Sequence, residues 1–215
     1  MNYIQRDKTV LPELDSTCRQ FQKEIFGMTK KEAYQHFKAR SHILKYNTSE
    51  TTSEFKRINY ERCSFCTMII QEFDREMTVE HIETKSDVPE KIYEWNNLLC
   101  ACKACNTKRS IKKYDDKKYL DPTKVEDIEK YFSYRGDGSI IVNGTLSDGE
   151  KAAAEYMIGL YGLDRDSLNY ERRRFFNDLL DDEFFEGLLK QRVDSRRIVF
   201  RSVFAYYKRR IRNGK

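Results

Sequence analysis

The sequence has no long apolar run and only 3 prolines and 9 glycines in 215 residues. No stretch approaches the roughly 18 consecutive apolar residues that would span a bilayer. The first residues, MNYIQRDKTVLPELD, lack the apolar segment of a secretory signal. There is also no Pro/Gly/Ser-rich linker, internal repeat or low-complexity tract. We therefore expect a soluble, cytoplasmic protein that does not contact a membrane.

Hydrophobic residues are also scarce, at 39%, while 35% of positions are charged. Disordered chains of this kind lack aromatic side chains, whereas 13% of this chain is aromatic, which predicts a folded protein. The net charge is +5, yet residues 195–215 alone hold eight basic residues and no acidic one. Such a segment can bind nucleic acid, a membrane or an acidic protein. Its apolar residues at helical spacing favour packing against the body or a partner helix: Phe200, Phe204, Tyr207 and Ile211.

Six cysteines stand out in a chain expected in a reducing compartment, where disulfides are rare. Four of them form two C-x-x-C pairs, Cys63/Cys66 and Cys102/Cys105, which is the spacing of a four-thiolate structural Zn²⁺ site. The alternative is a set of buried free thiols, since cysteine packs as a small hydrophobe. That interpretation suits Cys18 and Cys100 better, although Cys100 is close enough to be a rival ligand.

The segment between the two cysteine pairs contains residues that could bind a metal ion or accept a proton. It contains the apolar runs Thr67–Gln71 and Met77–Ile82, then a polar loop and Trp95–Leu99, and a helix begins at the second pair. Two short apolar runs followed by a helix predict a ββα unit held by zinc. Glu80 and Asn106 offer oxygen ligands to a hard cation such as Mg²⁺. His81, with a reference pKa of about 6.5, can accept a proton from water near neutral pH.

These residues resemble the HNH (ββα-metal) endonucleases. The resemblance lies in Glu80-His81, Asn97-Leu98 and Cys102-x-x-Cys105-Asn106 followed by Lys108. It implies that His81 is the general base, that Asn97 orients the base and its loop, and that Glu80 and Asn106 hold a catalytic Mg²⁺ or Mn²⁺. Many members have Asp and His where this chain has Glu80 and Asn106. Both residues here bind through oxygen, which suits Mg²⁺ or Mn²⁺.

Further motifs resemble the branch that contains the HNH nucleases of Septu anti-phage systems and of retrons. They are Lys85-Ser86-x-x-Pro89, Trp95, Leu120-Asp121-Pro122 and the Asp137-Gly138 turn. The resemblance implies an ABC-type ATPase partner, a hetero-oligomeric complex and a nucleic-acid substrate, which we expect to be DNA rather than RNA. We also expect Lys85, Lys108 and Arg109 to contact nucleic-acid phosphates, whereas His36 and His42 have no partner motif and read as structural or surface residues.

The predicted fold is therefore α+β: a zinc-stapled ββα core at 61–115 between a helical extension at 1–60 and a mainly helical region at 116–215. Capping boxes begin helices at Thr29 and Ser147, the first running to about Asn47. The other expected elements are a helix from about Asp15 to Phe26, a hairpin pairing residues 131–134 with 140–142, and a last helical stretch from about Asp182 to Arg212.

Two alternatives remain open at this level. The nuclease could cut RNA, for example a tRNA, within the same complex. The chain could instead be a non-catalytic, zinc-stabilised module that binds nucleic acid or the ATPase. The presence of Glu80, His81 and Asn106 argues against the second alternative, because a binding module needs none of them.

Overall fold

The structure is a computed structural model that describes residues 1, 3–6, 11–43, 45–70, 76–110, 114–190 and 200–212. It is a mixed α+β protein, as predicted. Its elements, in chain order, are α1 (Pro12–Glu24), α2 (Lys30–Arg40), α3 (Ser49–Ile58), β1 (Met77–His81), η1 (Pro89–Lys91), η2 (Trp95–Asn97), β2 (Leu98–Cys102), α4 (Lys103–Ser110), η3 (Ile128–Tyr131), β3 (Phe132–Tyr134), β4 (Ile140–Val142), α5 (Asp148–Tyr161), α6 (Asp166–Asp178), α7 (Asp182–Lys190) and α8 (Arg201–Arg212).

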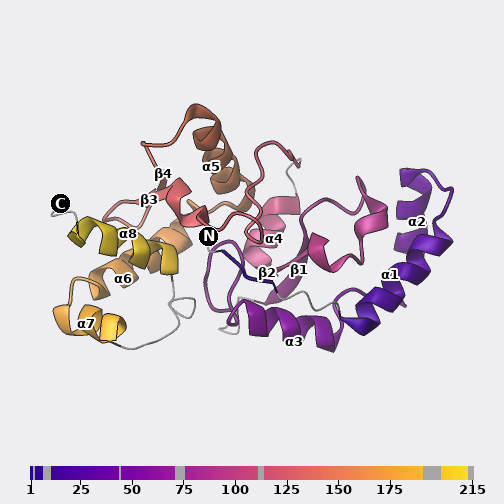
Figure 1. Ribbon diagram of the computed structural model, residues 1–215, viewed down its shortest axis with the longest axis horizontal. Helices are drawn as coiled ribbons and strands as arrows, with labels where there is room; N and C mark the ends of the chain where they lie inside the picture. Colours follow the sequence, from indigo (N-terminus) through magenta and orange to yellow (C-terminus); the bar gives the residue numbers. More distant parts are fainter. Residues whose placement is uncertain are drawn as a thin grey trace.

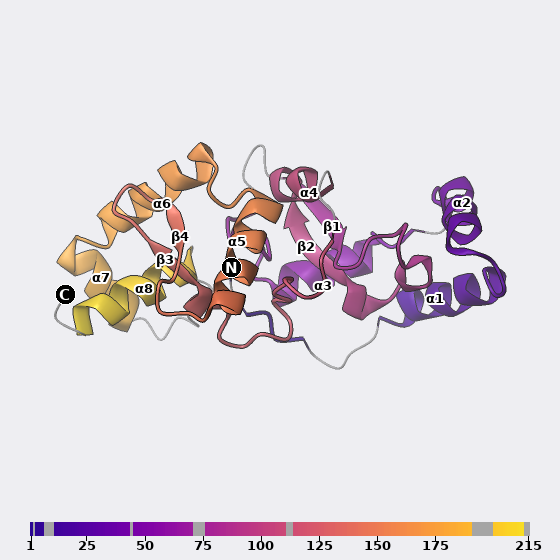
Figure 2. The same cartoon turned by 90° about the horizontal axis from the view of Figure 1, so that it is seen from above.

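The molecule is elongated, with the ββα core at its centre. Figure 1 shows α1 and α2 at one end, α6, α7 and α8 at the other, and β1, β2 and α4 between them, and the view in Figure 2 gives the same order. Helix α3 lies alongside the core, next to β2. Both helical regions are therefore placed to contribute residues to the centre. Among the helices of the described part, none is long and apolar enough to cross a membrane.

Helix α1 spans Pro12–Glu24 rather than about Asp15 to Phe26, whereas α2 begins where the sequence predicts but ends earlier. In the capping box of α2, the Thr29 side chain accepts from the Glu32 backbone and the Glu32 carboxylate accepts from the Thr29 backbone. The expected end near Asn47 is wrong, because α2 ends at Arg40. The chain then turns, so that the Tyr46 ring comes back to within 6.4 Å of Phe37 on the same helix.

The ββα unit is present, but its strands are not both those expected. The strand expected at Thr67–Gln71 is wrong over its described residues: Thr67 has left-handed backbone (φ 64°), and Cys63 N–H donates to the Met68 carbonyl to close a tight knuckle. Among the described residues of this segment, one isolated bridge forms, between Arg62 and Ile69. The two strands are β1 and β2, paired antiparallel with His81 opposite Leu98, and α4 follows β2 directly.

The C-terminal region contains the predicted hairpin, since β3 pairs antiparallel with β4. Gly138 in its turn has φ +84°, and an added Cβ would overlap the backbone of Asn169, so the turn requires glycine. Helix α5 has the predicted capping box at Ser147. Within the described part, the last helical stretch contains α7 and α8, and residues 191–199 and 213–215 lie outside that part.

The apolar stripe of the basic C-terminal segment packs against the body of the protein. Phe200 and Phe204 are buried, with ring centroids 5.9 Å from Phe175 and 5.8 Å from Phe185. Tyr207 lies edge-on to Phe185 at 5.4 Å. This packing confirms the intramolecular role of Phe200, Phe204 and Tyr207, while the Ile211 side chain lies outside the described part. Nucleic-acid contact by the basic residues stays a prediction.

Candidate active site and zinc centre

The four cysteines of the two pairs converge on one point. Their sulfur atoms all lie within 4.8 Å of one another, and all four side chains are buried. The Sγ atoms of Cys66 and Cys102 are 3.8 Å apart. Four thiolates at a Zn–S distance of about 2.3 Å form a tetrahedron with edges of about 3.8 Å. The cluster therefore fits a structural zinc ion, for which Cys63, Cys66, Cys102 and Cys105 would be the four ligands.

The two remaining cysteines are buried thiols outside this cluster. Burial raises the pKa of Cys18 to about 11 and raises the pKa of Cys100 further. A high pKa keeps both thiols protonated and unreactive at neutral pH. Although Cys100 is on β2 two residues before Cys102, it is not one of the four grouped sulfurs.

The C-terminal region completes the surroundings of the zinc centre. Phe65, within the first cysteine pair, stacks on Tyr161 of α5 with ring centroids 3.6 Å apart and planes at 14°. Arg165, just before α6, places a guanidinium nitrogen 3.6 Å from the sulfur of Cys105. Sequence motifs did not indicate Tyr161 or Arg165 as neighbours of the zinc centre. Both residues lie more than 50 positions after the cysteines in the chain.

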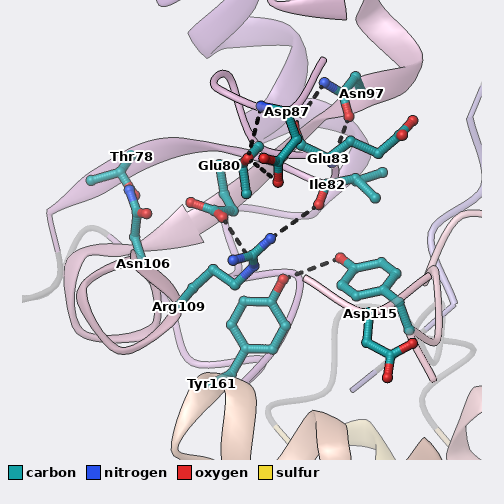
Figure 3. A network of polar contacts seen from close by, with 12 residues as sticks. Thr78, Glu80, Ile82, Glu83, Asp87, Asn97, Asn106, Arg109, Asp115 and Tyr161 are labelled. Carbon is teal, nitrogen blue, oxygen red and sulfur yellow. Dashed lines mark hydrogen bonds and ion pairs between the residues drawn. The ribbon is translucent and has the colours of Figure 1, made fainter. Parts of the chain in front are cut away.

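Helix α4 is fastened to one face of β1 by two polar contacts. Thr78 and Glu80 are two positions apart on the strand and so point to the same face. The Asn106 side-chain nitrogen donates to the Thr78 hydroxyl at 3.0 Å, and Arg109 Nε lies 3.7 Å from Glu80 Oε1. Figure 3 shows the Glu80 carboxylate directed toward Arg109 and the Asn106 amide beside Thr78. Helix and strand together thus bring Glu80 and Asn106 to one side of the core.

The Glu80 carboxyl group is in a poorly solvated position, with the residue only 8% exposed. Burial raises the pKa of Glu80 to about 7, while the positive charges of Arg109 and Lys85 act in the opposite direction. A carboxylate with so little water around it is stabilised by a bound cation, because the cation replaces the missing hydration.

The side chains of Glu80 and Asn106 have the donor chemistry expected for a hard cation. Because the Asn106 side-chain nitrogen donates a hydrogen bond to Thr78, the side-chain oxygen is the atom that could bind a cation. One carboxylate and one amide oxygen suit Mg²⁺ or Mn²⁺, which bind through few protein ligands and retain water or phosphate in the other positions. The residues fit such an ion, and their assignment as its ligands stays a prediction.

His81 follows Glu80 directly and is the last residue of β1, where the strand ends. Its Nε2 lies 2.9 Å from the Ile92 carbonyl, which can only accept a hydrogen bond. Nε2 therefore carries the proton, and Nδ1 keeps the lone pair. Burial lowers the pKa of His81 to about 3, Lys85 lowers it further, and the Ile92 bond opposes both. The imidazole is consequently neutral at physiological pH, and with a pKa this far below 7 it is a weaker proton acceptor than a solvent-exposed histidine.

Asn97 braces the loop that follows β1. Its side-chain oxygen accepts from the Glu83 backbone at 2.8 Å, and its nitrogen donates to the carbonyls of Glu83 at 3.2 Å and Lys91 at 3.1 Å. The Asn97 carbonyl also accepts from the Ile82 backbone, directly after His81. These contacts place Asn97 where it can fix the path of the chain on both sides of the Ile92 carbonyl.

The three predicted phosphate-binding residues lie in different surroundings. Lys108 is exposed on α4, as a phosphate contact requires. Lys85 is half-buried and donates to the Tyr46 hydroxyl at 3.1 Å. Arg109 is only 2% exposed and donates to the Ile82 carbonyl at 3.3 Å, besides its contact with Glu80. The sequence did not indicate that Arg109 would pair with Glu80. Phosphate binding by all three residues stays a prediction.

Comparison with known proteins identifies the same segment. Residues 63–112 match the family model of the HNH endonucleases, a range that contains the four clustered cysteines, Glu80, His81, Asn97 and Asn106. The Septu protein PtuB of Bacillus thuringiensis is 36% identical over 64 residues, which are 29% of this chain and 24% of that protein. The matching segment thus spans about a quarter of the relative's length. The resemblance to the HNH endonucleases predicted from the motifs is confirmed over this core.

Proposed function

We propose that the chain is a metal-dependent HNH endonuclease that hydrolyses phosphodiester bonds in nucleic acid. The observation that carries the proposal is the placement of Glu80, His81 and Asn106 around one zinc-anchored ββα unit. A structural role alone accounts for the cysteines but not for a buried carboxyl group whose pKa is near 7 beside a neutral, oriented imidazole. Groups with such perturbed pKa values concentrate at functional sites.

Each of these residues has a distinct role in the proposed reaction. His81 Nδ1 accepts the proton of the attacking water while Nε2–H stays on the Ile92 carbonyl. Glu80 and Asn106 hold the catalytic cation, and Asn97 keeps the His81 loop in place. When bound, Mg²⁺ or Mn²⁺ stabilises the charge that develops on the phosphate and on the leaving oxygen. Lys85 and Lys108 contact the backbone phosphates, which gives binding that is sequence-independent and salt-sensitive.

We propose anti-phage defence as the setting of this activity, with an ABC-type ATPase (PtuA-like) as the partner in a hetero-oligomer. The support is the name of the similar Septu protein and the matching motifs around the core. We propose DNA as the substrate, with RNA as the alternative within the same complex. The sequence match to that relative covers 64 residues, or 29% of this chain, so partner and substrate rest on resemblance alone.

The competing function is a zinc-stabilised binding module without catalysis. Both functions predict nucleic-acid binding, but only the nuclease requires Glu80, His81 and Asn106 together.

A cleavage assay separates these functions. The purified chain, with and without the ATPase, is incubated with end-labelled duplex DNA, single-stranded DNA and tRNA in Mg²⁺, Mn²⁺ or EDTA. We expect cation-dependent cleavage of DNA. Cleavage of tRNA alone would establish the RNA alternative, and binding without any product would establish the binding module.

A further inference from the structure

An aromatic residue from outside the matched core contacts the imidazole of His81. Tyr46, in the loop between α2 and α3, places its ring edge-on to the His81 ring, with centroids 4.7 Å apart and planes at 87°. Aromatic rings at this distance and angle attract each other, because the positive edge of one meets the negative face of the other. The N-terminal region thus reaches the proposed catalytic base directly.

The Tyr46 ring is itself held from several sides. Its centroid lies 6.4 Å from Phe37 on α2 and 6.4 Å from Tyr93, both of which are buried. Its hydroxyl accepts a hydrogen bond from Lys85, whose ammonium nitrogen is 5.1 Å from the ring centroid. Two residues later, Thr48 caps α3 and fixes the exit of the loop. The ring therefore has little freedom to move away from His81.

This contact complements the single hydrogen bond that orients the imidazole. The Ile92 carbonyl holds Nε2 but leaves the ring free to rotate about the line of that bond, and rotation would redirect Nδ1. A perpendicular ring packed against the imidazole opposes this rotation. General bases lose efficiency steeply when they leave the productive geometry, by on the order of 100-fold for 1 Å of displacement.

We propose that Tyr46 is a positioning residue for His81, and that its ring, packed edge-on to the imidazole, keeps Nδ1 aimed at the attacking water. The effect of Tyr46 on the reaction rate rests on the proposed function, whereas its effect on the orientation of the His81 imidazole does not. It gives the N-terminal helical region a part in catalysis, besides its contribution to the core.

The test compares Tyr46→Leu, Tyr46→Phe and, as the matched control, Tyr34→Leu. Tyr34 stacks on Phe37 at 6.3 Å in the same aromatic cluster, and among the described residues its ring contacts Phe37 and Lys38 rather than His81. Each variant is checked for zinc content and thermal unfolding. The values of kcat and KM for labelled DNA are then measured, and the His81 tautomer is read from long-range ¹H–¹⁵N spectra. The chain has only 3 histidines, so a His81→Gln spectrum identifies the signals.

We expect Tyr46→Leu to lower kcat by about 10- to 100-fold with KM within about twofold, and to add an Nδ1–H population at His81. Tyr46→Phe, which keeps the ring, and Tyr34→Leu should retain the wild-type kcat and the Nε2–H tautomer. The inference fails if Tyr46→Leu leaves both kcat and tautomer unchanged, or if Tyr34→Leu or Tyr46→Phe reproduces its loss. Should the wild-type chain cut nothing, the proposed function fails, whereas the tautomer spectra still decide whether Tyr46 positions His81.

Discussion

Two buried cysteines, 37 positions apart, offer a sharp test of the zinc centre. Cys63 is 1% exposed and belongs to the four-sulfur cluster, whereas Cys100 is 0% exposed and lies outside it. Serine differs from cysteine by one atom, so Cys63→Ser and Cys100→Ser make the same chemical change at equally buried positions. Their consequences should differ because only Cys63 belongs to the cluster to which we assign the zinc ion.

The expected magnitudes are far apart. Structural zinc supplies an apparent binding free energy of about 10–16 kcal/mol in zinc-finger peptides. This is comparable to the roughly 5–15 kcal/mol that separates a folded domain from its unfolded state. Loss of the ion should therefore unfold the ββα core. A serine hydroxyl buried at position 100 costs only about 1–3 kcal/mol.

The assay combines elemental analysis with thermal unfolding followed by circular dichroism. The wild type and Cys100→Ser should hold about one zinc ion per chain, and Cys100→Ser should unfold cooperatively at a lower temperature. Cys63→Ser should hold none and lack the wild-type transition. A Cys63→Ser chain with full zinc content, or a Cys100→Ser chain without zinc, would refute the ligand assignment.

Two further predictions concern the residues around β1. Asn97→Ala removes three side-chain hydrogen bonds from a residue that is 4% exposed. Urea denaturation should therefore show that the free energy of unfolding falls by about 2–4 kcal/mol. A loss below about 0.5 kcal/mol would show that Asn97 does not stabilise this loop. Because burial raises the pKa of Glu80 to about 7 and a cation must displace that proton, Mg²⁺ affinity measured by calorimetry should rise from pH 6 to pH 8, with proton release at the lower pH. Equal affinity at both pH values would show that Glu80 is not the ligand.

The parts of the site that the sequence predicted are those whose residues lie close together in the chain. The C-x-x-C pairs set the sulfur spacing locally, and Glu80 and His81 are neighbours on one strand, so pattern alone indicated them. The apolar residues of Thr67–Gln71 favour a strand, and this prediction is wrong over the described residues. The cysteine knuckle instead turns the chain there, with Thr67 in left-handed backbone. The second strand, Leu98–Cys102, is buried throughout and therefore shows no alternation.

The residues that the sequence did not indicate lie in distant segments and contact the site only through tertiary packing. Tyr46 meets His81 only because α2 ends at Arg40, seven positions before its expected end, and the chain turns back. Tyr161 and Arg165 reach the zinc centre from α5 and the turn before α6. Such contacts depend on the relative placement of helices, which local propensity does not encode. The boundaries of 1–60, 61–115 and 116–215 as separate units stay a prediction.

The measurement that bears most directly on the proposed nuclease is the rate of DNA cleavage by His81→Ala. The comparison uses wild type and, as a matched control, His42→Ala, whose side chain is exposed. All three chains are assayed with Mg²⁺ and the ATPase, after equal zinc content has been established. Loss of the general base should lower the rate by about 10²- to 10⁴-fold in His81→Ala and leave His42→Ala unchanged. Cleavage by His81→Ala at the wild-type rate would contradict the account.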